Sequence, residues 1–157
     1  MSSTSAMPRA DARLVSWAPG RFLALAAHAT LEIVEHPQAI PVPGQATHAL
    51  GLLAWHRRYV PLVDLRTALD PGGPRAAAAF PYALVVVGRD TPGAPACFVA
   101  LALRELPATV RVGDDDACPL PGGHAPWHRI ALSCFLHAGD AVPVVDVPRL
   151  LALLRDA

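Results

Sequence analysis

The chain has 157 residues, of which 53% are hydrophobic, and its 13 basic side chains balance its 13 acidic ones. This length and composition favour one compact domain with an extensive apolar core, and the lack of a basic excess argues against a nucleic-acid partner. The longest uninterrupted apolar run, residues 96–103, is far shorter than the roughly 20 residues of a membrane span.

The N-terminal residues contain no continuous apolar segment of a signal peptide, so we expect a cytoplasmic protein without membrane insertion. Residues 1–11 are mostly small and polar, and we expect a disordered tail there, followed by a single domain over residues 12–157. Strands are predicted over residues 12–17 and 21–26, because the intervening Ala-Pro-Gly is typical of a turn.

The next segments lead into a hairpin. Residues 27–35 are ambiguous between a helical turn and a strand, and the prolines of residues 36–47 predict an extended connection. Two apolar runs around a short polar tip then predict a β-hairpin over residues 50–65. A helical turn is expected over residues 65–69, and a junction between two halves of the domain is expected near residues 70–80.

The second half repeats this alternation of strands and turns. Apolar runs predict strands over residues 82–87 and 96–103, and a shorter strand over residues 110–112. A second hairpin follows, and apolar residues at helical spacing predict a C-terminal helix over residues 148–154.

The two hairpins resemble each other. Val60-Pro61-Leu62-Val63-Asp64-Leu65 matches Val142-Pro143-Val144-Val145-Asp146-Val147 at a shift of 82 residues. Weaker matches keep the same order: residues 22–25 resemble residues 98–101, and residues 41–44 resemble residues 119–122. Chance is the alternative in a proline-rich chain, but two similar β units that share one core explain the ordered matches better.

The sequence offers no convincing reactive centre. Pro126 lies between His124 and His128 and excludes the helix that would bring both imidazoles to one face, so no metal or other cofactor is expected. Ser133 lacks the Gly-x-Ser-x-Gly context of a catalytic serine. The three cysteines are an odd number without Cys-x-x-Cys spacing, which argues against a disulfide framework.

Asp64 and Asp146 each follow a Val-Pro strand and precede a predicted helix. A phosphoacceptor role for Asp64 is conceivable, but the recurrence of the pattern favours helix caps at both positions.

Residues 51–65, Gly-Leu-Leu-Ala-Trp-His-Arg-Arg-Tyr-Val-Pro-Leu-Val-Asp-Leu, resemble the signature of the CheW family. In that signature Gly, two aliphatic residues, Asn-Leu-Arg-Gly, two or three further residues, Val-Pro, two aliphatic residues and Asp-Leu follow in this order. The resemblance extends over about residues 12–155. It departs at the hairpin tip, where His56 replaces the family's Arg and Arg57 replaces its Gly, and at Leu101, where the family usually has Asp.

The resemblance implies an all-β fold of two small SH3-like five-stranded barrels that share a core, with short helical segments and a C-terminal helix. It also implies a non-enzymatic adaptor of a chemosensory array that links the chemoreceptor cytoplasmic tip to the regulatory domain of a CheA-type histidine kinase. An auxiliary CheW-like protein of a pilus-type or other alternative chemosensory pathway is the main alternative, and a small metal-dependent β-barrel enzyme or ligand binder is a further one. By analogy with the family, the partner-binding candidates are Glu32, Ile33, Val34, Gly51, His56, Arg57, Arg58 and Leu65.

Overall fold

The computed structural model describes residues 8–73 and 79–156. Its strands are β1 (Arg9–Ala18), β2 (Arg21–Ala26), β3 (Thr30–Glu35), β4 (Ala39–Ile40), β5 (Ala49–Trp55), β6 (Arg58–Val63), β7 (Tyr82–Gly88), β8 (Cys97–Leu103), β9 (Ala108–Gly113), β10 (Ala131–His137) and β11 (Asp140–Val145). The helices are α1 (Leu65–Leu69), α2 (Trp127–Ile130) and α3 (Val147–Asp156), and two 3₁₀ turns are η1 (Ala27–Ala29) and η2 (Asp114–Asp116).

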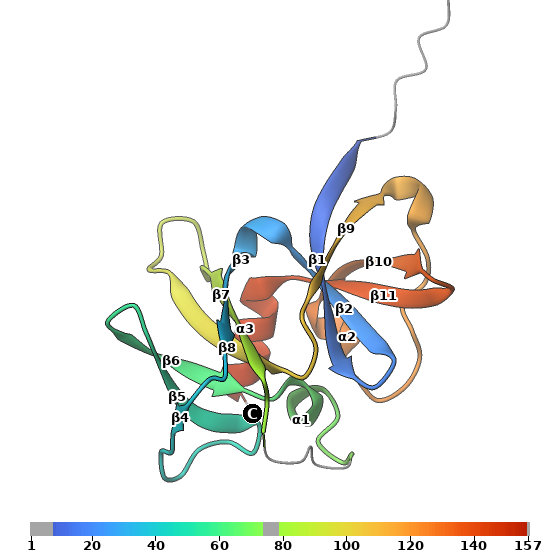
Figure 1. The fold of residues 1–157 in the computed structure, drawn as a ribbon. Coiled ribbons are helices and arrows are strands. Elements are labelled where there is room, and N and C mark those ends of the chain that lie inside the picture. Colours follow the sequence, from blue (N-terminus) through green and yellow to red (C-terminus); the bar gives the residue numbers. More distant parts are fainter. Residues whose placement is uncertain (1–7, 74–78, 157) are drawn as a thin grey trace, which may run out of the picture.

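These strands form two curled sheets, with α3 between them (Figure 1). The five-stranded sheet has the order β10-β11-β2-β1-β9, and the six-stranded sheet has the order β3-β7-β8-β6-β5-β4. The predicted all-β fold with a C-terminal helix is confirmed. Three short elements were not predicted, namely the helix α2, the 3₁₀ turn η2, and β4, a two-residue strand that the prolines around it keep short.

The internal repeat is visible in the strand pairing. The register of the β5–β6 hairpin shifts between Ala49 and Gly51, and that of the β10–β11 hairpin shifts between Ala131 and Ser133, which are the positions 82 residues later. Each hairpin also has a parallel neighbour at the equivalent place, because β6 runs parallel to β8 and β11 runs parallel to β2. The two hairpins therefore occupy equivalent places in two similar sheets.

Each sheet combines strands from both halves of the sequence. The hairpin β1–β2 joins β9, β10 and β11, whereas β3 to β6 join β7 and β8. Parallel neighbours cannot be connected by a tight turn, so the strand beside β11 comes from the distant β2. The expected junction near residues 70–80 thus separates the two sequence repeats but not the two sheets, and its residues 74–78 lie outside the described part of the chain.

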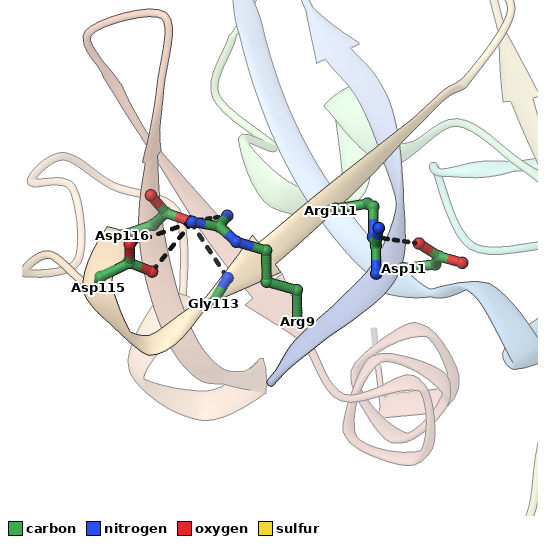
Figure 2. Close-up of polar contacts among 6 residues, drawn as sticks. All are labelled: Arg9, Asp11, Arg111, Gly113, Asp115 and Asp116. Atoms are coloured by element: carbon green, nitrogen blue, oxygen red, sulfur yellow. Dashed lines mark hydrogen bonds and ion pairs between the residues drawn. The ribbon is translucent and has the colours of Figure 1, made fainter. Parts of the chain in front are cut away.

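The first strand begins earlier than predicted. Strand β1 begins at Arg9, and its first residues pair with β9. The Arg9 guanidinium also contacts the carboxylates of Asp115 at 3.1 Å and Asp116 at 3.2 Å, and Arg111 lies 3.6 Å from Asp11 (Figure 2). Backbone pairing and these contacts order residues 9–11, so the prediction of disorder is wrong for these three residues. Residues 1–7 lie outside the described range.

The largest apolar cluster lies between the sheets. It receives side chains from both of them and from the buried face of α3, which consists of Val147, Leu150, Leu151 and Leu154. Trp17 and Trp127 meet there edge to face, with ring centroids 5.6 Å apart. Leu101, at the position where the resembled family usually has Asp, is fully buried in this shared core.

Two aspartates lie at the beginnings of helices. The Asp64 carboxylate accepts hydrogen bonds from the backbone N–H of Arg66 at 3.1 Å and from the hydroxyl of Thr67 at 2.8 Å. The Asp146 carboxylate accepts from the backbone N–H of Arg149 at 3.2 Å. Both arrangements are those of a helix N-cap.

Replacing Asp146 by alanine should lower the free energy of unfolding by about 1 kcal/mol, because the backbone N–H at the start of α3 loses its acceptor. Denaturant titration measures the change. Asp156→Ala, which removes an exposed carboxylate at the other end of α3, is the control and should not destabilise the protein. Equal midpoints for Asp146→Ala and wild type would contradict the capping role.

Candidate partner-binding surface

Glu32 connects two strands that are far apart in the six-stranded sheet. Its carboxylate accepts a hydrogen bond from the indole N–H of Trp55 at 2.5 Å and lies 2.9 Å from Nε2 of His56. Glu32 belongs to β3, at one edge of the sheet, and Trp55 ends β5, near the other edge. The curl of the sheet thus brings together two of the predicted regions, the β3 glutamate and the hairpin tip.

Aromatic and cationic groups extend this contact. The Trp55 ring lies edge-on to the His56 ring at 4.5 Å and packs on Phe98 of β8 at 5.6 Å. The guanidinium of Arg58 lies 4.5 Å from the centre of the Phe98 ring, a cation–π distance. We call the group formed by Glu32, Trp55, His56, Arg57, Arg58 and Phe98 the Glu32–tip surface.

The Glu32–tip surface has an anchored base and an exposed rim. Trp55 and Phe98 are half-buried against the apolar core of the six-stranded sheet, whereas Glu32, His56 and Arg58 are exposed. The half-buried rings fix the position of the charged groups around them. Such a surface suits recognition of a polar protein partner better than chemistry on a small substrate.

Hydrogen bonds from Trp55 and then from His56 hold the pKa of the Glu32 carboxyl below its usual value. Because the pKa of Glu32 is lower in the folded state, its carboxylate contributes stability at pH values above the pKa in the unfolded state, about 4.3. This contribution is lost as the pH falls through the pKa in the folded state. The stability difference between wild type and Glu32→Gln should therefore shrink below about pH 4. Denaturant titrations across pH 3–7 measure it, and Glu35→Gln, an exposed glutamate of the same strand, is the control. A difference independent of pH would contradict this role of the carboxylate.

A family model described as CheW-like domain matches residues 15–155. The chain belongs to the CheW-like domain family. Its fold is also similar to the crystal structure of the scaffolding protein TtCheW from Thermoanaerobacter tengcongensis, with a TM-score of 0.68 and 11% identity over 88% of this chain and 90% of that one. No curated protein matches the sequence. CheW-like proteins are scaffolds and adaptors of chemotaxis signalling.

The departure of this CheW-like chain from the family signature falls at a two-residue turn. His56 and Arg57 both have positive φ, 45° and 62°, as type I′ hairpin turns require. In the other repeat the same places are taken by Ala138 and Gly139, with φ of 50° and 84°. Arg57 therefore occupies a left-handed position that suits glycine better.

Arg57→Gly should raise the free energy of unfolding by about 1 kcal/mol, since it relieves the left-handed strain of a residue with a Cβ. The matched variant is Gly139→Ala in the equivalent turn, which should destabilise the CheW-like domain by a similar amount. Denaturant titration of both gives the comparison. A lower free energy of unfolding for Arg57→Gly would show that the arginine side chain stabilises the fold by more than its left-handed backbone conformation destabilises it.

The remaining predicted site residues lie deeper. Ile33 and Val34 are half-buried and pack on the shared core and on the core of the six-stranded sheet, respectively. Gly51 is buried beside β4, and Leu65 is 1% exposed in the shared core. The burial of Gly51 and Leu65 favours a packing role for both in this conformation, and a partner contact at either position stays a prediction.

The sequence prediction missed two members of the surface. Trp55 lies within the signature, but its apolar ring fits a core position as well as an interface, so the sequence alone does not assign it to the surface. Phe98 lies inside an apolar run and is distant from the tip in sequence, so nothing local indicated its place beneath Arg58.

Residues 8–73 and 79–156 contain no group of three or more His, Cys, Asp or Glu side chains that could hold a metal ion. In the same residues no helix is both long and apolar enough to cross a membrane.

Proposed function

We propose that this protein is a cytoplasmic, non-enzymatic adaptor that couples the cytoplasmic tips of chemoreceptors to the regulatory domain of a CheA-type histidine kinase. Membership of the CheW-like family supports a scaffold role in chemotaxis signalling. The observation that carries the proposal further is the Glu32–tip surface, where an acidic group, an imidazole and cationic side chains surround half-buried aromatic rings.

This composition matches the anchors of protein interfaces. Trp and Arg are over-represented among the residues that dominate binding energy, and they are most effective where a rigid base positions them. Trp55 supplies that base, because its hydrogen bond to the Glu32 carboxylate and its contact with Phe98 fix the position of its ring. Arg57 and Arg58 then present positive charge beside it, so the complementary partner surface is acidic.

The test is the affinity for a CheA-type regulatory domain, measured by calorimetry for wild type and Arg57→Glu. Because Arg57 is exposed, Arg57→Glu should change stability by less than about 0.5 kcal/mol but should weaken binding about tenfold or more. Arg129→Glu, at an exposed arginine of α2 outside the Glu32–tip surface, is the matched control and should bind like wild type. Equal affinities of wild type and Arg57→Glu would place the binding surface elsewhere.

The altered tip favours a second candidate, an auxiliary CheW-like protein of a pilus-type or other alternative chemosensory pathway. His56 and Arg57 replace the Arg-Gly of the family signature and change both the charge and the backbone preference of the turn. Binding assays against several CheA-type kinases from one organism separate the two candidates. Preference for the kinase of an alternative pathway over the motility kinase would support the second.

A further inference from the structure

Cys118 and Cys134 face each other across a short antiparallel contact. Their Sγ atoms are 3.4 Å apart, and the backbone N–H of Cys118 donates to the carbonyl of Cys134 at 3.0 Å. The preceding and following residues, Ala117 and Phe135, form an antiparallel bridge. Residues opposite each other in such a pair have Cα atoms about 5.5 Å apart, which is within the range of disulfides.

The internal repeat shows that the fold does not require thiols at this place. In the six-stranded sheet, Ala39 pairs with Leu53 and Ile40 pairs with Leu52, as Ala117 and Cys118 do with Phe135 and Cys134 in the five-stranded sheet. An aliphatic pair thus occupies the position of the cysteines in the other repeat. The contact between the two sulfurs is a feature of one sheet only.

We propose that Cys118 and Cys134 form a redox-reversible modification site, which a hydroperoxide closes to a disulfide and a dithiol reductant reopens. In the first step the Cys118 thiolate attacks peroxide, so an S–O bond forms, the O–O bond breaks and hydroxide leaves. In the second step the Cys134 sulfur attacks the sulfenic sulfur of Cys118 and its proton passes to the departing hydroxyl, so the S–S bond forms, the S–O bond breaks and water leaves. The two thiols lose two protons and two electrons, and hydrogen peroxide is reduced to two waters.

The different burial of the two thiols determines which of them reacts first. Burial, and then the adjacent Cys118, raise the pKa of the Cys134 thiol to about 12, so this group stays protonated near neutrality. Cys118 is the more exposed of the pair and is the one that a solvent oxidant reaches first. Cys134 then attacks the sulfenic acid of Cys118 across the 3.4 Å separation of the two Sγ atoms.

The disulfide would connect the ends of the segment from Cys118 to Cys134, which contains α2 and the buried Trp127. Closing a loop of this length restricts the unfolded chain. We expect the oxidised protein to unfold about 6–12 °C higher than the reduced protein.

The experiment treats the full chain with hydrogen peroxide, blocks remaining thiols with iodoacetamide and maps the peptides by mass spectrometry. The expected result is a loss of two hydrogens and a Cys118–Cys134 cross-link that dithiothreitol removes, together with the higher unfolding temperature. Cys97→Ser keeps both proposed partners and should behave like wild type. Cys118→Ser, at the half-buried position, should show neither the cross-link nor the temperature shift.

Three outcomes would overturn the proposal. They are full alkylation of Cys118 and Cys134 after peroxide treatment, a cross-link that involves Cys97, and oxidation of Cys118 that stops at the sulfinic acid. A peptide map distinguishes all three. The result does not depend on the proposed adaptor function, because no partner is present in the assay.

Discussion

Replacing Gly51 by alanine should lower the free energy of unfolding by about 3 kcal/mol, because the added Cβ has no room and the backbone is unfavourable for it. A Cβ at this position would lie 2.5 Å from the carbonyl oxygen of Ile40, which is a backbone atom of β4 and cannot rotate away. The φ of Gly51 is 135°, which side chains rarely allow. The glycine thus permits β4 to pair with β5 where the hairpin register shifts.

Denaturant titration of Gly51→Ala measures this cost. The matched control is Ser133→Ala at the equivalent position of the other repeat, where the residue is exposed and already carries a Cβ. We expect that variant to stay within about 0.5 kcal/mol of wild type. A similarly small effect for Gly51→Ala would mean that β4 does not lie against β5 in solution.

Leu65→Ala should cost about 3 kcal/mol of stability and leave partner affinity unchanged in the folded protein. Leu65 begins α1 and is 1% exposed, and it packs in the core shared by the two sheets. Removing its side chain leaves a cavity that the surrounding strands cannot fill completely. Leu132→Ala, at a 61% exposed leucine of β10, is the control and should change stability little.

The measurement combines thermal unfolding with kinase-domain binding under conditions in which the variant is folded. The family resemblance alone suggests a partner contact for Leu65, whereas its burial predicts a packing role. Reduced affinity at unchanged stability would contradict the packing role.

Local features of the fold were predictable from sequence. The turn at residues 18–20, both Val-Pro hairpins and the apolar face of α3 follow from turn residues and apolar periodicity within short segments. The aspartates before α1 and α3 also stood out, because the same pattern occurs twice.

Long-range arrangement was not predictable in the same way. Nothing in the β1–β2 segment indicates that it pairs with β9 and β11, because those choices depend on the shape of the complete sheets. The early start of β1 depends on its pairing with the distant β9, where Arg9 also meets two aspartates.

The candidate surface shows the same limit. The family resemblance indicated Glu32 and the tip separately, but their contact depends on the curl of a six-stranded sheet. For Gly51 and Leu65 the signature could not distinguish a residue retained for packing from one retained for binding. Burial in the folded chain favours packing for both residues.

The most direct test of the adaptor role is whether the protein binds a kinase regulatory domain and a receptor tip at the same time. Size-exclusion chromatography with light scattering, on a mixture with a CheA-type regulatory domain and a soluble chemoreceptor tip fragment from the same organism, measures this. We predict a ternary complex whose mass requires all three components, and its loss when this protein is omitted. Competition between the two partners for the protein, or no binding of either at saturating concentration, would contradict the account.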